Sequence, residues 1–316
     1  MHITGTTRVY LIFGDPVAQV RAPEIYNALF ARHGVDAVLV PLQVAAEQAS
    51  VLAHAGLAAG NVGGLWLTIP HKSVLLDELA SCDLQGRVAG AVNAVRRSAD
   101  GALHGALFDG TGLVKALRHF GLALAGRRVL LLGAGGAGSA IAAALSRDAT
   151  RATGEAPLAE LALFDAQPGR ADATVARLVE ALAAGAAPAN VNADADADAA
   201  ADLPRIRVAA SSDPSGYDLI INATPLGLNA ADPLPLDVER LQAGAAVVDI
   251  LMKRATTPLV QACLARGIKA WPGHEMMTQQ VGDYLRFFGH AEVADAVEAD
   301  LDLVRELFAA SAQRTG

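Results

Sequence analysis

Three glycines that follow a short apolar run are the residues of this chain best placed to bind a phosphate group. Gly133, Gly135 and Gly138 have the spacing G-x-G-x-x-G and come directly after the apolar residues 129–132. In a strand–turn–helix unit the first glycine allows a tight turn, the second lets a pyrophosphate approach the backbone, and the third lets helix and strand pack closely. The helix N-terminus offers its N–H groups to the phosphates. The expected dinucleotide contacts are Gly133, Ala134, Gly135, Gly136, Ala137 and Gly138.

A second set of polar side chains could transfer protons. Lys72 follows the apolar strand expected at 64–69, and ligands of α/β proteins usually bind at strand ends; the alternative is an exposed lysine that opens a helix. Asn93 interrupts an apolar run, so it needs hydrogen-bond partners either in a site or within the structure. Asp109 could belong to a site or simply cap the following helix. His71 is better explained as a helix-start residue than as a metal ligand, and no His/Cys/Glu group has metal-ligand spacing.

The elements that must position these residues alternate between strands and helices. In the first half, strands are expected at 9–13, 37–41 and 64–69, helices at 22–33, 45–58 and 110–120, and a hairpin at 91–107. In the second half, strands are expected at 129–132, 161–164, 219–222 and 245–250, and helices at 136–147, 171–184, 257–266, 275–288 and from 293 to 308. Buried, non-alternating strands between helices indicate a parallel, doubly wound sheet.

The strand at 219–222 closes with a turn of the kind expected beside a cofactor. The cofactor contacts predicted around this turn are Asn222, Ala223, Thr224 and Pro225, together with Ile250 at the end of the next strand.

Composition excludes several classes of protein. Of the 316 residues 53% are hydrophobic and 18% charged, which indicates a globular chain long enough for two domains. The net charge of -8 without a basic cluster argues against a nucleic-acid partner. No apolar stretch approaches the roughly 20 residues that cross a bilayer, and the N-terminus lacks a signal-peptide pattern, so we expect a soluble, cytoplasmic protein. We further expect a monomer or a homodimer.

Two minor features complete this picture. Cys82 and Cys263 lie far apart in sequence and are expected to be buried free thiols in a reducing compartment. The segment 185–203 is rich in alanine and aspartate; a solvated insertion is favoured over an acidic metal-binding loop.

Taken in order, these segments resemble the shikimate/quinate dehydrogenases along nearly the whole chain. The segments that carry the resemblance are 13–18, 68–72, 89–93, 109–113, 133–138, 222–227 and 257–259. The resemblance implies an α/β fold of two domains. An N-terminal α/β substrate domain would span 1–107, with 275–316 packing back on it, and a Rossmann-like, doubly wound NAD(P)-binding domain would span 108–274.

The resemblance also implies a reaction and roles for single residues. The expected reaction is reversible hydride transfer between the nicotinamide and a ring hydroxyl or ketone of a small cyclic hydroxy acid or ketone, of the shikimate/3-dehydroshikimate type. Lys72 and Asp109 would flank the substrate hydroxyl and pass its proton. As a cation, Lys72 would also stabilise negative charge on a carbonyl oxygen during reduction. Thr68, Asn93 and Gln280 would line the substrate pocket.

The chain departs from the family on the substrate side. Val20 and Ala22 stand where the family usually has hydroxyl residues that hold the substrate carboxylate, and Trp66 stands where it usually has asparagine. Phe108 and its two predecessors replace the usual Asp-Asn-Thr, and Met252 replaces a frequent tyrosine. Loss of two charge-assisted hydrogen bonds, at about 1.5–3 kcal/mol each, favours a changed substrate, unless Arg21 compensates.

The segment after the strand at 161–164 bears on the cofactor. The family resemblance places an Asn-Arg-Thr/Ser run here in NADP-using relatives, whereas this chain has Asp165-Ala166-Gln167, with Arg170 nearby. An aspartate accepts hydrogen bonds from a ribose 2′-OH and repels a 2′-phosphate. The expected cofactor is therefore NAD in preference to NADP.

Two other functions fit parts of the pattern. A non-catalytic NAD-binding regulatory protein of the same fold would explain the lost carboxylate donors, but it would have little need of Lys72 and Asp109 together. A methylenetetrahydrofolate-dehydrogenase-like enzyme shares the two-domain layout, but the segments around Asn93 and Asp109 match it poorly.

Overall fold

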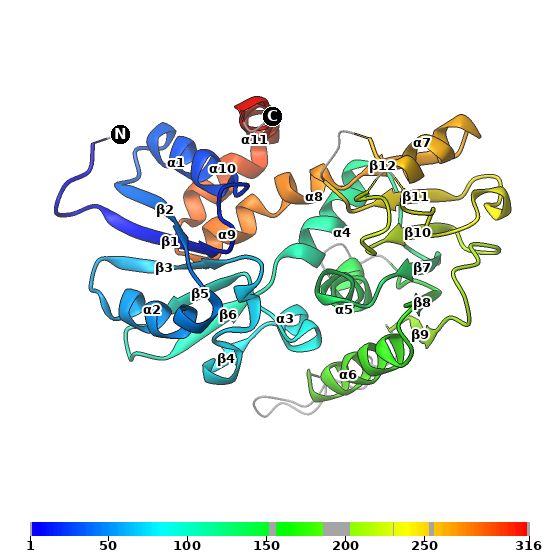
Figure 1. Cartoon of the computed structure of the whole chain (residues 1–316), viewed down its shortest axis with the longest axis horizontal. Helices are drawn as coiled ribbons and strands as arrows, with labels where there is room; N and C mark the ends of the chain where they lie inside the picture. The colour runs from blue at the N-terminus through cyan, green and yellow to red at the C-terminus, as the bar shows by residue number, and fades with distance from the viewer. Residues whose placement is uncertain (1, 152–155, 186–202, 230, 253–255, 315–316) are drawn as a thin grey trace. The chain divides into compact units, whose positions relative to one another are not determined.

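The computed structural model describes residues 2–151, 156–185, 203–229, 231–252 and 256–314. They form two compact units: 1–86, 90–108 and 278–316 make up the first, and 87–89 with 109–277 make up the second (Figure 1). Most of the Ala/Asp-rich segment lies outside the described residues. Among the residues that are described, no helix is both long and apolar enough to cross a membrane.

The first unit is built on a mixed six-stranded sheet in the order β2-β1-β3-β5-β6-β4. Its strands are β1 (Arg8–Gly14), β2 (Ala37–Gln43), β3 (Val62–Leu67), β4 (Ser81–Cys82), β5 (Ala94–Arg97) and β6 (Leu103–Ala106). β1 pairs in parallel with β2 and β3, whereas β5 and β6 form an antiparallel pair. The predicted hairpin is therefore confirmed. The connections contain α1 (Ala22–Arg32), α2 (Ala46–Ala58) and the short α3 (Leu84–Ala89), and two 3-10 turns, η1 (His71–Ser73) and η2 (Leu76–Glu78).

The C-terminal helices belong to this first unit. α9 (Val281–Phe287), α10 (Ala291–Ala299) and α11 (Leu301–Arg314), orange to red in Figure 1, lie beside the blue β1 and α1. Their apolar faces share one core with Tyr10 and Trp66 of the sheet. These helices therefore belong to the first unit, and burying their apolar faces there removes a large apolar area from water.

The second unit contains an all-parallel sheet in the order β12-β11-β10-β7-β8-β9. Its strands are β7 (Arg128–Leu132), β8 (Glu160–Phe164), β9 (Arg205–Val208), β10 (Leu219–Asn222), β11 (Ala246–Asp249) and β12 (Lys269–Pro272). Numbered within the unit, the order is 6-5-4-1-2-3, which is the Rossmann arrangement. The strand order reverses between β7 and β10, and in such sheets the ligand crevice opens at the carboxyl ends of these two strands.

One helix of this unit precedes β7, others lie in the connections between its strands, and one follows β12. They are α4 (Asp109–His119), α5 (Gly136–Arg151), α6 (Arg170–Gly185), α7 (Pro258–Ala265), the 3-10 turn η3 (Val238–Arg240) and α8 (His274–Gln279), which runs across the boundary between the two units. The doubly wound, Rossmann-like fold class is confirmed.

The structure corrects several sequence-based expectations. The helix expected at 275–288 is two helices separated at Gln280, and the last helix is likewise divided at Asp300. Asp300 leaves the helical conformation (φ -138°, ψ 76°) and precedes α11, as aspartate commonly does at a helix start. Of the two cysteines, Cys263 is buried, and burial raises the pKa of its thiol to about 11, but Cys82 is partly exposed.

Candidate functional site

The glycine turn joins β7 to α5, and each of its three glycines meets a different constraint. Gly133 has φ +95°, and a Cβ there would lie 2.6 Å from the Ala223 carbonyl oxygen. A Cβ on Gly138 would overlap the Gly133 carbonyl oxygen, whereas a Cβ on Gly135 or Gly136 would meet no protein atom within 4 Å. The first and third glycines are therefore required by the protein's own packing. The second faces open space, as a turn that admits a pyrophosphate requires.

The carboxylate of Asp165 is hydrogen-bonded to this turn and to the residues that follow β8. The Ala134 N–H donates to Asp165 Oδ2 at 2.8 Å, and the Gln167 N–H donates to Oδ1, also at 2.8 Å. The Arg170 guanidinium lies 3.6 Å from Oδ2 and also donates to the Gln167 side chain. Both carboxylate oxygens thus have backbone donors, and a cation offsets the negative charge.

The loop after β10 forms the neighbouring wall. The Asn222 side chain is fully buried; its oxygen accepts from the Thr224 N–H (3.1 Å) and hydroxyl (2.7 Å). Ala223 donates its N–H to the Leu132 carbonyl at the end of β7. Ile250 is buried and donates its backbone N–H to the Asn222 carbonyl. The structure therefore brings together, within the second unit, the predicted cofactor residues at the ends of the four adjacent strands β11, β10, β7 and β8.

Three predicted site residues of the first unit, Thr68, Lys72 and Asn93, lie near the carboxyl end of β3. The Thr68 N–H donates to the Phe13 carbonyl, and the Val92 N–H donates to the Lys72 carbonyl at 2.7 Å. The Leu67 N–H bonds the Asn93 carbonyl, which fixes the lysine loop beside the asparagine.

Hydrogen bonds of neighbouring residues hold this lysine loop. His71 is buried and donates from Nε2 to the Val44 carbonyl at 2.7 Å, so its ring anchors the loop, in line with its interpretation as a structural residue. The buried Asn93 side chain accepts from the Phe108 N–H at 3.3 Å.

The other two predicted site residues are also buried. Gln280 lies immediately before α9. Asp109 is the first residue of α4 and is buried in the second unit, so its meeting with Lys72 stays a prediction.

Three of the positions that depart from the family, Val20, Ala22 and Trp66, lie against apolar groups. Val20 and Ala22 are partly buried and pack on the core of the first unit. Trp66 is only 3% exposed and stacks on Phe288, with ring centroids 4.0 Å apart, and on Tyr284 at 5.6 Å. The structure thus makes Trp66 a core residue, and any contact between it and a substrate stays a prediction.

Sequence reasoning missed the roles of two residues, Phe108 and Asp249. Phe108 was identified only as a departure, but its ring lies 4.8 Å from that of Tyr284 and extends the aromatic cluster toward Asn93. Asp249 was not singled out at all, although it is fully buried beside Asn222. A signal existed for Asp249, because it is an acidic residue at the end of an apolar strand, much as Asp165 directly follows one.

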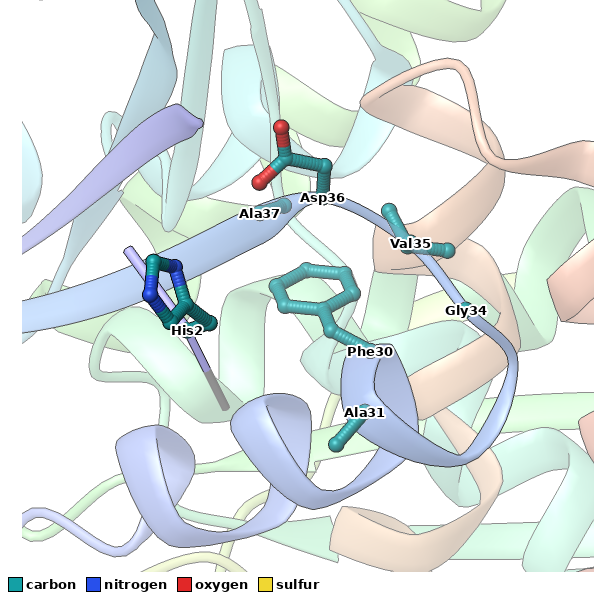
Figure 2. Close-up of a pocket in the computed structure, with 7 residues that line it drawn as sticks. All are labelled: His2, Phe30, Ala31, Gly34, Val35, Asp36 and Ala37. Atoms are coloured by element: carbon teal, nitrogen blue, oxygen red, sulfur yellow. The ribbon is translucent and has the colours of Figure 1, made fainter. Parts of the chain in front are cut away.

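A separate hollow of about 230 Å³ lies at the α1–β2 end of the first unit (Figure 2). It is lined by His2, Phe30, Ala31, Gly34, Val35, Asp36 and Ala37. None of these is a predicted site residue. The Asp36 carboxylate accepts hydrogen bonds from the hydroxyls of Thr6 and Thr7, and these bonds hold its pKa below the usual range.

Comparisons with known proteins identify a matching family and similar structures. Residues 12–95 match the shikimate dehydrogenase substrate binding domain. The structure is similar to that of shikimate 5-dehydrogenase from Listeria monocytogenes (TM-score 0.74, 22% identity, 94% of this chain and 98% of that one). It is also similar to quinate dehydrogenase from Corynebacterium glutamicum (TM-score 0.73, 24% identity, 96% and 99%). At these identities the structural likeness shows the fold.

Sequence relatives give the family and correct the cofactor. The chain is 36% identical over 279 residues to the NADP(+) shikimate dehydrogenase of Rubrobacter xylanophilus, covering 88% of this chain and 89% of the relative. It is 34% identical over 317 residues to the enzyme of the same name from Acidiphilium cryptum (95% and 99%). Because these relatives are NADP(+) enzymes, the expected preference for NAD is wrong. The physical reason is that the Asp165 carboxylate accepts two backbone hydrogen bonds and lies beside the Arg170 guanidinium. Its negative charge is therefore compensated and does not act as an isolated charge. The length and identity of these matches show that the chain belongs to the shikimate dehydrogenase family.

Proposed function

We propose that this protein is an NADP(H)-dependent dehydrogenase that interconverts a ring hydroxyl and a ring ketone of a small cyclic substrate. The observation that carries the proposal is the pairing of two sites on one chain. One is a glycine turn open at Gly135 in a Rossmann sheet; the other is a lysine loop tied to Asn93 at a strand end. Family membership supports the same reaction. The experiment that tests it is NADP+ reduction in the presence of shikimate, quinate and related ring alcohols.

The residues of the second unit fit a dinucleotide. The open side of Gly135 and Gly136 would receive the pyrophosphate, next to the N–H groups that begin α5. The wall formed by Asn222, Ala223, Thr224 and Pro225 would lie along the nicotinamide half. When bound, the nicotinamide supplies the acceptor or donor of the hydride.

The remaining chemistry belongs to residues of the chain. An alcohol that loses a hydride must also lose its hydroxyl proton, and a positioned basic group lowers the barrier to that loss. Lys72 and Asp109 would exchange this proton with the substrate oxygen. In the reverse direction the Lys72 ammonium would stabilise charge on the carbonyl oxygen. Thr68, Asn93 and Gln280 would orient the ring by hydrogen bonds.

Arg170 is the side chain we assign to the 2′-phosphate of NADP. It lies next to Asp165, and its side chain is 46% exposed, so it can contact a ligand. We expect Arg170→Ala to raise the KM for NADP by about 10–100-fold, the loss of one charge-assisted hydrogen bond of roughly 1.5–3 kcal/mol, with little change for NAD. Steady-state kinetics with both cofactors measure this. An equal rise in KM for both would contradict the assignment.

For the substrate, we propose a ring that lacks a carboxylate at the place where shikimate has one, or that carries it elsewhere. Val20 and Ala22 offer no hydroxyl donor, and both pack on an apolar core. Two missing charge-assisted bonds would weaken shikimate binding by about 10²–10⁴-fold. A KM for shikimate or quinate in the millimolar range or lower would overturn this substrate proposal, while leaving the reaction type untouched.

Restoring the two hydroxyls gives the matching test by gain of function. The double variant Val20→Ser/Ala22→Ser is expected to raise kcat/KM for shikimate at least about tenfold, since each serine adds a donor to a carboxylate. The control substrate is an analogue of shikimate that lacks the carboxylate. The kcat/KM of the double variant for this analogue should not rise. If both substrates respond equally, the serines act on folding or loop order instead of on the carboxylate.

A further inference from the structure

The loops at the ends of β10 and β11 converge on one buried carboxyl group, that of Asp249. Asp249 Oδ1 accepts from Asn222 Nδ2 at 3.0 Å and from the Leu251 N–H at 3.3 Å. Oδ2 accepts from the Thr257 hydroxyl at 2.5 Å. The side chain is fully buried, and burial raises the pKa of the carboxyl. A buried ionisable group is costly, and apolar packing can be more stable than a buried polar network. Asp249 therefore calls for an explanation besides stability.

The bond to Asp249 fixes the orientation of the Asn222 amide. With Nδ2 directed at Asp249, the amide oxygen is directed at Thr224, where it accepts from both the backbone N–H and the hydroxyl. The Thr224 hydroxyl oxygen in turn accepts from the Leu226 N–H at 3.2 Å. One buried carboxyl thus sets the path of the whole turn.

This turn touches the glycine turn directly. An added Cβ on Gly133 would lie 2.6 Å from the Ala223 carbonyl oxygen and 2.9 Å from the Thr224 nitrogen. The contact lies where β7 and β10 are neighbours, at the reversal of strand order that marks the ligand crevice. A shift of the 222–226 turn would change the shape of the cofactor site without removing any group that binds the cofactor.

We propose that Asp249 is a positioning residue for the dinucleotide: through the Asn222 amide it holds the 222–226 turn against Gly133. The proposal rests on the cofactor site of the proposed function. The competing explanation is that Asp249 only supports α7, since Thr257 also caps that helix by accepting from the Val260 N–H.

The test compares NADPH affinity with folding stability in Asp249→Asn. An asparagine carries no negative charge and has one acceptor oxygen in place of two, so its hydrogen bonds to the Asn222 amide and the Thr257 hydroxyl cannot both keep their present direction and strength. We expect the Kd for NADPH, measured by calorimetric titration, to rise about tenfold, as for one lost hydrogen bond to a charged group. The matched control is Cys263→Ala, which removes a buried side chain of α7 in the same core. It should lower Tm but leave the Kd unchanged.

Exchanging the side chains at positions 222 and 249 provides a rescue experiment for NADPH affinity. In Asp249→Asn/Asn222→Asp the amide stands at 249 and the carboxylate at 222, so the hydrogen bond between them is restored with reversed direction. The double variant should recover part of the NADPH affinity that the single variant loses, since the Leu251 N–H, which also donates to Oδ1, does not regain its acceptor. A Kd for Asp249→Asn equal to that of the control, or a double variant no better than the single one, would overturn the proposal.

A second pair of variants covers the case in which Asp249→Asn does not fold. Thr257→Val removes the hydroxyl that donates to Asp249, whereas Thr257→Ser keeps it. NADPH affinity should fall in the valine variant and persist in the serine variant; equal affinities would refute the positioning role. All these experiments measure NADPH binding. A failure of the proposed function would instead appear as absent turnover of ring alcohols by the wild-type protein, so the two failures can be distinguished.

Discussion

Replacing Lys72 by alanine is expected to lower kcat by about 10²–10⁴-fold, the usual contribution of a positioned acid–base group. The Kd for NADP(H) should change little, because Lys72 is not among the residues predicted to bind the cofactor. The loop itself should persist, since the Lys72 carbonyl accepts from Val92 and the neighbouring His71 ring bonds Val44. Initial rates of NADP+ reduction with the best ring alcohol measure the loss.

The matched control for this variant is Lys269→Ala, which removes an exposed lysine at the start of β12. It should keep both kcat and cofactor affinity. A Lys72→Ala enzyme that retains more than about a tenth of the wild-type kcat would exclude Lys72 from proton transfer. If the wild-type protein binds NADPH and turns over no ring substrate, the regulatory alternative is favoured.

Replacing Gly138 by alanine is expected to destabilise the second unit by about 2–4 kcal/mol, the range of severe overpacking. The new Cβ would overlap the Gly133 carbonyl oxygen, and because that atom is backbone, α5 or the turn must move. NADPH binding should be lost with it. Thermal unfolding with and without NADPH measures both effects.

Gly135→Ala is the paired variant, because a Cβ at this position meets no protein atom within 4 Å and its φ is not in the left-handed region. The protein without cofactor should be as stable as wild type, within about 0.5 kcal/mol. NADPH affinity should nevertheless fall about tenfold or more, because the methyl group occupies the approach of the pyrophosphate. Wild-type affinity in this variant would show that the pyrophosphate does not pass over Gly135.

The sequence predicted the elements whose apolar pattern is continuous and failed where the pattern is short or weak. The Rossmann strands 129–132, 161–164 and 219–222 are confirmed as β7, β8 and β10. β9 (Arg205–Val208) was missed because four residues that alternate arginine with an apolar residue resemble a loop. The break at Asp300 was missed because helical periodicity continues across a single non-helical residue.

The candidate site was predictable to the extent that it depends on local chemistry. The different roles of Gly133, Gly135 and Gly138 follow from their spacing, and the structure gives each a distinct packing reason. The cofactor preference was not predictable from Asp165, because the local sequence does not show that both its oxygens accept from backbone groups. Trp66 looked like a pocket residue, but its tertiary partners, Tyr284 and Phe288, are more than two hundred residues away in sequence.

Transfer of deuterium tests the central claim, hydride transfer to a ring carbon, most directly. The wild-type protein would be incubated with NADPH deuterated on the transferred position of the nicotinamide, together with 3-dehydroshikimate and the corresponding ketone without a carboxylate. The ring alcohol formed from at least one ketone should carry one deuterium on its new C–H carbon, as mass spectrometry would detect, with more product from the ketone that lacks the carboxylate. Recovery of both ketones unchanged under conditions in which the protein binds NADPH would contradict the account.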